Sequence, residues 1–235
     1  MEKYFDVAYL WESIPMLLPF LKVTFMAAGL SVFFGTLVGL LLAMMKLGTS
    51  QIAKKIANGY TTIIRCTPSI VLLFLIFYGI PKLAAPFGVN LNELHTAVFV
   101  VITFSLQFGA LMSEVMRTAY ESIDRGQFEA AVSVGLSPLQ AFRRIVLPQA
   151  FVVALPNFGN SFLELLKEGS LAYTIGLVDI MGKASLIISN NYNSHSLEIY
   201  LALSIIYWVL SILIEQLFFQ LEKVFSKGKQ VIKTT

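Results

Sequence analysis

The chain has 235 residues, of which 57% are hydrophobic and only 13% are charged, and its formal net charge is +3. Soluble domains carry roughly twice that share of charged residues, so the composition excludes an ordinary water-soluble globule. The high hydrophobicity also excludes a disordered chain, and the small net charge without clustered bases excludes a nucleic-acid-binding face. The composition indicates an all-α protein that crosses a membrane several times, as a single domain over residues 1–235.

Five stretches are long and apolar enough to span a bilayer as helices, for which about 20 residues are needed. In chain order they are residues 23–45, 56–81, 94–113, 145–163 and 199–221. The second stretch reaches full length only if it extends back to residue 56 and takes in Arg65. Pro148 and Pro156 interrupt the fourth, and Pro148 is expected to start a new element. Pro156, Gly159 and Gly169 predict weak helix continuity there.

Basic residues near the span ends are distributed unevenly, and Lys and Arg are enriched on the cytoplasmic side of membrane proteins. One side carries twelve of them: Lys46, Lys54, Lys55, Arg65, Arg117, Arg125, Arg143, Arg144, Lys223, Lys227, Lys229 and Lys233. The other side carries four: Lys3, Lys22, Lys82 and Lys183. We therefore expect a multi-pass protein of the cell membrane with its N-terminus outside and its C-terminus in the cytoplasm.

Small residues recur at every fourth position of the first span: Ala27, Ser31, Gly35, Gly39 and Ala43. They share one ridge of a helix and would allow another helix backbone to approach closely. The ridge predicts a packing seam, within the chain or between two copies, unless it only reflects how common small residues are in membrane helices.

The stretch between the third and fourth spans, residues 121–148, is polar enough to leave the membrane and shows two short helical patterns. The first begins near Asp124, and Gly135 is placed to end it in a left-handed conformation. Ser137 is the expected N-cap of the second helix, with Pro138 at its first position. Apolar residues at a spacing of three form one face of that helix: Leu139, Phe142 and Ile145. This pattern predicts a helix–turn–helix on the cytoplasmic surface that docks into a groove of another protein.

The same stretch reads Glu129-Ala130-Ala131, three residues, Gly135, nine residues, Ile145, one residue, and Leu147-Pro148. This pattern resembles the EAA loop of ABC importer permeases, and we call residues 121–148 the EAA loop. In that family the loop forms the coupling helices that seat on the ATPase subunit. The resemblance implies a coupling role for six residues: Glu129, Ala130, Ala131, Gly135, Leu139 and Phe142.

The resemblance extends over most of the chain. Arg65-Cys66-Thr67-Pro68 is similar to the Arg-Gly-Thr-Pro motif of polar amino acid permeases, with Cys66 in place of Gly. The run from Lys167 to Leu171 is similar to Lys-Asp-Thr-Ser-Leu, with Glu168 for Asp and Gly169 for Thr. The implied fold is the five-helix MetI-like core, working as a dimer with an identical or closely related permease. The implied partners are an ATPase dimer, an extracellular solute-binding protein and a polar amino acid, and the similarity to the cystine and glutamine branch favours L-cystine.

Ionisable residues inside a membrane cost about 2.5–3.5 kcal/mol each at its centre, so they indicate a site or a charge pair. A cavity lined by four polar residues, Gln107, Glu114, Glu168 and Ser170, would suit the ammonium group of an amino acid. The alternative is that Glu114 and Glu168 are structural partners of Arg65, Arg117 or Lys167. Lys167 is also spaced to neutralise Glu164. For Glu215 the alternatives are a partner on a neighbouring helix or a position near the cytoplasmic interface.

Two classes of function fit these features. The first is the permease subunit of an ATP-driven importer. The chain contains no Gly-x4-Gly-Lys-Ser/Thr loop, so we expect no catalytic activity, no bound cofactor and no metal, with ATP and Mg²⁺ held by a separate ATPase. The second is a secondary transporter that uses the buried carboxylates for ion coupling. Such carriers usually contain inverted repeats, and we find none here.

Overall fold

The computed structural model describes residues 5–226, and the regular elements within that range are all helical. Five helical stretches are long and apolar enough to cross a membrane, which confirms the predicted number of spans. They are Val7–Leu47, Ser69–Phe87, Thr96–Glu121, Pro138–Ile175 and Ser196–Ser226. Four basic residues used to predict the orientation lie outside the described residues: Lys3, Lys227, Lys229 and Lys233.

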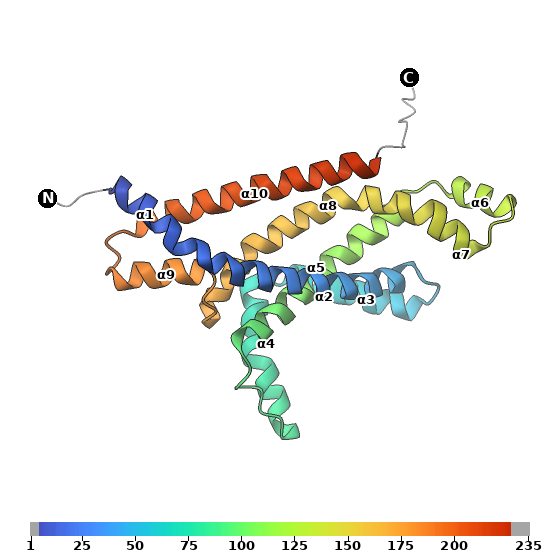
Figure 1. The fold of residues 1–235 in the computed structure, drawn as a ribbon. Helices are drawn as coiled ribbons and strands as arrows, with labels where there is room; N and C mark the ends of the chain where they lie inside the picture. The colour runs from blue at the N-terminus through green and yellow to red at the C-terminus, as the bar shows by residue number, and fades with distance from the viewer. Residues whose placement is uncertain (1–4, 227–235) are drawn as a thin grey trace.

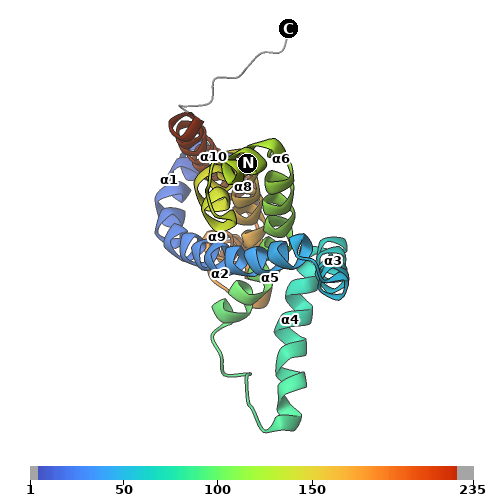
Figure 2. The same cartoon turned by 90° about the vertical axis from the view of Figure 1, so that its right-hand side faces the viewer.

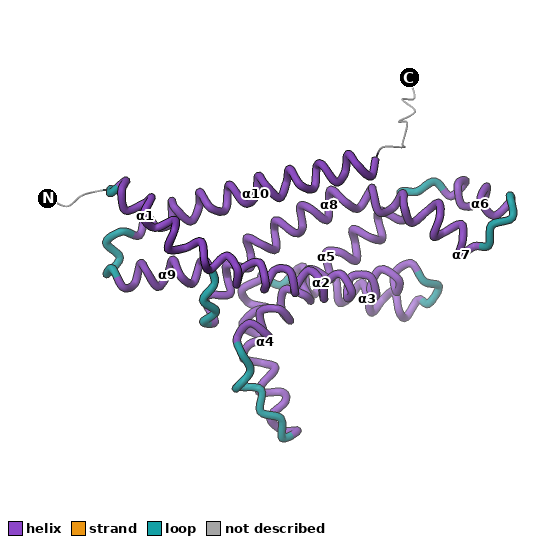
Figure 3. Tube along the Cα trace, in the orientation of Figure 1, coloured by secondary structure: helices purple, strands orange, loops and turns teal. Residues whose placement is uncertain are grey.

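Four long helices follow the long axis of the molecule: α2 (Leu21–Leu47), α5 (Thr96–Glu121), α8 (Leu147–Glu168) and α10 (Ser196–Ser226). Helix α4 (Ser69–Ala84) points away from them in both views (Figures 1 and 2). The EAA loop, the turn after α2 and the end of α10 lie at one end of the molecule, whereas the start of α10 lies at the other (Figure 3). The helix ends that carry most of the twelve basic residues are therefore gathered on one side.

The first span is longer than the predicted residues 23–45. It begins with α1 (Val7–Leu17), continues through the 3-10 turn η1 (Leu18–Phe20) and then enters α2. The Asp6 side chain caps the start of α1 by accepting hydrogen bonds from the amides of Ala8 and Tyr9. Counting only uncharged residues hid this extension, because Glu12 and Lys22 lie within it.

The second span was predicted to start near residue 56, and this boundary is wrong. Residues Gln51–Cys66 form a separate helix, α3, and the chain then turns at Thr67 and Pro68 before α4 begins. Thr67 has ψ 125°, outside the helical region, because the proline ring disfavours a helical conformation in the residue before it. The second crossing is Ser69–Phe87, which includes the short 3-10 turn η2 (Ala85–Phe87), and Arg65 is not part of it.

The small-residue ridge of α2 packs against α5 within the chain. A Cβ atom added to Gly39 would lie 2.7 Å from Met112 Cβ, and one added to Gly35 would lie 2.9 Å from Phe108 Cβ. Gly109 on α5 is equally tight, at 2.7 Å from Val38 Cγ1. Of the two packing partners predicted for the seam, the structure therefore shows the intrachain one, and the core around Phe108 is built upon it.

The fourth span starts at Pro138 rather than at residue 145. The EAA loop contributes α6 (Arg125–Ser133) and α7 (Pro138–Ala141), and α7 continues without a break through the π-helical turn η3 (Phe142–Val146) into α8. Pro148 therefore does not start a separate element. The wider turn accommodates it, because the amide of Leu147 bonds to the carbonyl of Phe142, five residues back.

Helix α8 also continues through Pro156 and Gly159, so the predicted loss of continuity there is wrong. Gly159 serves close packing instead: an added Cβ would lie 2.8 Å from Phe218 Cγ on α10. The predicted weakening is confirmed only at Gly169, where α8 gives way to the 3-10 turn η4 (Gly169–Ile175).

A short helix that the sequence did not predict, α9 (Ile180–Asn190), connects the fourth and fifth spans. Asp179 is 1% exposed and caps its start, accepting a hydrogen bond from the amide of Gly182 at 2.8 Å. Burial raises the pKa of the Asp179 carboxyl from 3.8 to about 6, against the opposing effect of the Gly182 hydrogen bond. The carboxyl lies near the N-terminal end of α2, where Thr24 Oγ1 is 3.5 Å from its Oδ2.

Candidate functional site

A polar cluster lies where α4, α5 and α8 meet. The side-chain amide of Gln107, on α5, donates from Nε2 to Ser69 Oγ at 2.7 Å and to Glu168 Oε2 at 2.6 Å. Ser69 is the first residue of α4 because Pro68 ends the preceding segment, and Glu168 is the last residue of α8 because the chain tightens at Gly169. Two helix ends and the middle of a third helix thus bring together side chains from distant parts of the sequence.

The cluster carries an unneutralised carboxylate. Within residues 5–226, no Lys or Arg lies within ion-pair distance of Glu168, and Lys167 does not pair with Glu164. The Gln107 Oε1 atom is buried and has no hydrogen-bond partner. A half-buried carboxylate beside an unused carbonyl acceptor provides acceptors for a ligand that brings donors and positive charge, such as an ammonium group.

The other two residues predicted for this path are placed differently. Ser170 is half-buried in η4, two residues after Glu168, and among the described residues it has no hydrogen bond to the cluster. Glu114 lies seven residues beyond Gln107 on α5, which corresponds to about 10 Å along the helix axis. The structure therefore brings Gln107 and Glu168 together and places Glu114 in a separate network.

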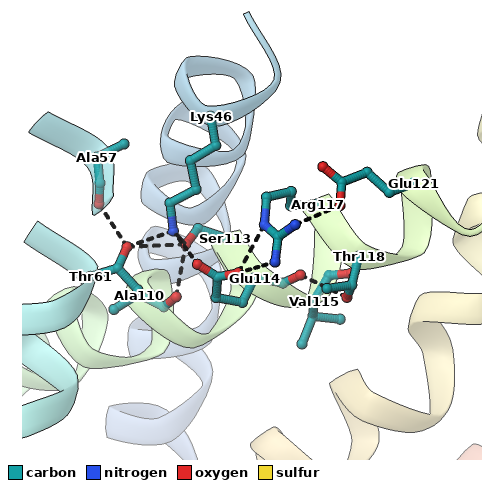
Figure 4. A network of polar contacts seen from close by, with 10 residues as sticks. All are labelled: Lys46, Ala57, Thr61, Ala110, Ser113, Glu114, Val115, Arg117, Thr118 and Glu121. Carbon is teal, nitrogen blue, oxygen red and sulfur yellow. Dashed lines mark hydrogen bonds and ion pairs between the residues drawn. The ribbon is translucent and has the colours of Figure 1, made fainter. Parts of the chain in front are cut away.

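That second network joins α2, α3 and α5 at the EAA-loop end of the helices (Figure 4). Lys46 Nζ donates to Glu114 Oε1 at 2.6 Å, to Thr61 Oγ1 at 2.7 Å and to Ser113 Oγ at 2.9 Å. The Lys46 side chain is only 2% exposed, so these three acceptors satisfy all the donors of a buried ammonium group. Arg117 holds the other carboxylate oxygen of Glu114 through Nη2 at 2.7 Å and Nε at 2.9 Å.

Sequence reasoning named Arg117 as a partner for Glu114 but missed Lys46 and Thr61. Lys46 was counted only as a marker of orientation. The signal was present in the ridge of small residues, because Lys46 follows Ala43 by three positions and therefore shares the face of α2 that packs against α5. The network continues toward the EAA loop through Arg117 Nη1, which bonds to Glu121 Oε2 at 2.5 Å.

The EAA loop has the predicted local structure. Asp124 caps α6, Gly135 adopts a left-handed conformation with φ +97°, and Ser137 forms a capping box with Gln140. Glycine is favoured at such a turn because a side chain there costs on the order of 1–2 kcal/mol. The turn therefore sets the angle at which α7 leaves α6.

The apolar residues of the EAA loop differ in how far they are exposed to solvent. Leu139 is 64% exposed, whereas Phe142 is half-buried against Tyr120, with 6.1 Å between ring centroids. Val134, which the sequence analysis did not single out, is the most exposed apolar residue of the loop at 81%. Of the Glu129-Ala130-Ala131 run, only Ala131 is buried, because α6 packs against η3. The outward-facing knobs are thus Val134 and Leu139.

Comparison with known proteins identifies the class of this fold. Residues 35–227 match the family model for the binding-protein-dependent transport system inner membrane component. The L-cystine transport system permease protein TcyL of Bacillus subtilis (strain 168) is 41% identical over 234 residues, covering 100% of this chain and 97% of TcyL. The probable amino-acid ABC transporter permease protein PatM of Vibrio harveyi is 38% identical, covering 87% of this chain and 89% of its own length.

Solved structures agree with this result. The chain superposes on a crystal structure of an amino acid ABC transporter with histidines with a TM-score of 0.80 and 31% identity, covering 93% of this chain and 98% of that one. An inward-facing MetNI methionine ABC transporter, at 17% identity and a TM-score of 0.67, shares the fold, which confirms the predicted MetI-like architecture. The helical core, the EAA loop and these similarities together show that the chain belongs to the family of binding-protein-dependent transport system inner membrane components, the permease subunits of ABC importers.

Proposed function

We propose that this permease moves a polar L-amino acid across the cell membrane, with L-cystine as the leading candidate. The support is the full-length similarity to TcyL, which is named as an L-cystine permease, together with the polar cluster at Glu168. An ABC permease works with an ATPase and a second permease. We propose that the ATPase dimer seats on the EAA loop, that the second permease is an identical or closely related chain, and that an extracellular solute-binding protein delivers the substrate.

The observation that carries the substrate class is the unneutralised carboxylate of Glu168, held by Gln107 where three spans meet. An ion in the membrane is costly unless it faces a partner or water. Amino acids bring the missing partner as their α-ammonium group, and the free Oε1 of Gln107 offers a second acceptor. In this proposal the chain binds and passes the substrate without catalysis, and ATP and Mg²⁺ stay on the ATPase.

The test compares Glu168→Gln with Glu164→Gln, a matched control one turn earlier on α8 that is exposed. Uptake of radiolabelled L-cystine is measured beside the amount of assembled complex. We expect Glu168→Gln to reduce uptake strongly with normal complex abundance, and Glu164→Gln to change uptake little. Loss of complex in Glu168→Gln that is restored by adding Lys167→Met would assign Glu168 to structural pairing. Uptake of radiolabelled L-glutamine without uptake of radiolabelled L-cystine would replace the substrate.

The proposed orientation, N-terminus outside and EAA loop in the cytoplasm, has its own test. In a Cys66→Ser background, Ser137→Cys on the EAA loop should be protected from membrane-impermeant thiol reagents in intact cells. Tyr192→Cys should be labelled, since Tyr192 is 93% exposed at the opposite end. Labelling in the reverse pattern would overturn the orientation without affecting the substrate proposal.

A further inference from the structure

An apolar groove of about 670 Å³ lies between α2, α5 and α8, separate from the polar cluster. Apart from Thr36 and Tyr120, its lining residues are apolar or glycine. Along α8 they run from Leu147 to Phe158, a distance of about 16 Å at the helical rise. The hydrocarbon core of a bilayer is about 30 Å thick. The groove therefore covers the depth of one leaflet, starting at the EAA-loop end of the helices.

The groove faces away from the polar side of α5. Successive residues of an α-helix are rotated by about 100°, so Met112 and Val115 lie roughly 140° and 80° around α5 from Gln107, and Met116 about 180°. These three residues line the groove. Glu114, by the same count, lies only about 20° from the direction of Gln107. The helix thus turns its polar face to the cluster and the Lys46 network, and its opposite face to the groove.

Two arginines without an ion pair among the described residues lie in η3, the turn whose first residue, Phe142, lines one end of the groove. Phe142 and Leu147 both line it, and Arg143 and Arg144 follow Phe142 directly in the π-helical turn η3. Both arginines are exposed, and neither has an ion pair within the part of the chain that the structure describes. Guanidinium groups recognise phosphate oxygens well, and basic residues at this level of a membrane attract anionic lipids.

We propose that the groove holds an acyl chain of an anionic phospholipid whose phosphate is bound by Arg143 and Arg144. The occupant needs a hydrocarbon tail of one-leaflet length and a negative charge at the membrane surface, and an anionic phospholipid has both. A second copy of this chain fits less well. An interface with two-fold symmetry centred on the groove would bring four arginines together at its mouth. The proposal does not depend on the identity of the transported substrate.

The test uses quenching of tryptophan fluorescence by phospholipids with brominated acyl chains. The two native tryptophans are replaced in a Trp11→Phe/Trp208→Phe background, and Phe151→Trp provides a reporter inside the groove, where Phe151 is 50% exposed. Leu41→Trp is the control, since Leu41 is 61% exposed at a similar depth on α2 and does not line the groove. Vesicles contain brominated phosphatidylglycerol or brominated phosphatidylcholine in both leaflets, so the result does not depend on orientation.

We expect half-maximal quenching at Phe151→Trp at an about tenfold lower mole fraction of phosphatidylglycerol than of phosphatidylcholine, since each arginine near the lipid charge contributes a factor of about five at most. Leu41→Trp should show no such preference. Adding Arg143→Gln/Arg144→Gln should abolish the preference, whereas Lys54→Gln/Lys55→Gln, an equal loss of charge on α3, should retain it. Equal quenching by both lipids at Phe151→Trp, or a preference that survives the loss of both arginines, would overturn the proposal. Absence of quenching by either lipid, with disulfide-linked dimers formed by Phe151→Cys in a Cys66→Ser background, would assign the groove to a second copy.

Discussion

Because α2 packs so closely against α5, alanine substitutions at Gly39 and Gly29, two glycines of α2, should have opposite effects on thermal stability. Alanine at position 39 would place its Cβ 2.7 Å from Met112 Cβ, 3.1 Å from the carbonyl oxygen of Gly109 and 3.2 Å from the amide nitrogen of Ser113. Carbon atoms in ordinary contact are about 3.5–4.0 Å apart. The two helices would therefore have to separate by roughly 1 Å, because two of the three atoms belong to the α5 backbone and cannot rotate away.

Gly29 is the matched control, since a Cβ there meets nothing within 4 Å. Both substitutions gain the same helix propensity, about 1 kcal/mol, so their difference isolates the cost of overpacking, about 1–3 kcal/mol. Each kcal/mol shifts the midpoint of thermal unfolding by about 2–4 °C for a chain of this size. We expect Gly39→Ala to unfold below, and Gly29→Ala at or above, the temperature of the unmodified protein in the same detergent. Equal midpoints for the two variants would show that the α2–α5 seam is not tight.

Three further predictions concern the EAA loop, the buried ion pair and pH. Gly135→Val strains a residue at φ +97°, and Leu139→Asp places a charge on an exposed apolar side chain. Both variants should insert into the membrane but show reduced uptake and reduced co-purification of the ATPase. Full ATPase retention with normal uptake in both would refute the coupling role. Lys46→Met removes the cation that lies 2.6 Å from Glu114 and should lower the free energy of unfolding by up to about 3 kcal/mol. The double variant Lys46→Met/Glu114→Gln should recover part of this stability. No recovery of stability in the double variant would contradict the pairing. The pKa of Asp179 is raised from 3.8 to about 6 in the folded state, so the folded state binds the proton more tightly than the unfolded state. The stability that the protonated Asp179 contributes is therefore present below about pH 4 and is lost as the pH rises through 6. Asp179→Asn, which keeps the N-cap, should abolish that decline in the unfolding midpoint between pH 4 and 6, and an unchanged pH profile would exclude Asp179 as its source.

The number of spans was predictable because bilayer thickness imposes a length that apolar runs must reach. The ends of the spans were not predictable, because the effect of a charged residue or a proline on a helix depends on the structure around it. Glu12 and Lys22 are tolerated inside a helical stretch of 41 residues that exceeds the thickness of the bilayer. Pro68 separates two helices because it holds Thr67, the residue before it, outside the helical conformation. Pro148, in contrast, is accommodated by a π-helical turn that no local sequence pattern predicts. The same residue type therefore stands just before the start of one span and lies within another.

In the candidate site, too, the local features were predictable from the sequence and the long-range contacts were not. Local chemistry predicted the turn at Gly135 and the N-cap at Ser137, since both depend on residues only a few positions apart. The pairing of carboxylates depends on which helix faces are opposed, and that information resides in the packing of α2 against α5. Once Gly35 and Gly39 bring the two backbones into contact, Lys46 is carried to Glu114, and Glu114 is neutralised far from Gln107. Among residues 5–226, no Lys or Arg forms an ion pair with Glu168, and its hydrogen-bond partner is Gln107. Whether a carboxylate is neutralised, as Glu114 is, or left for the substrate, as we propose for Glu168, thus depends on which helix packs against it. The spacing of small residues on α2 was the sequence feature that carried this information.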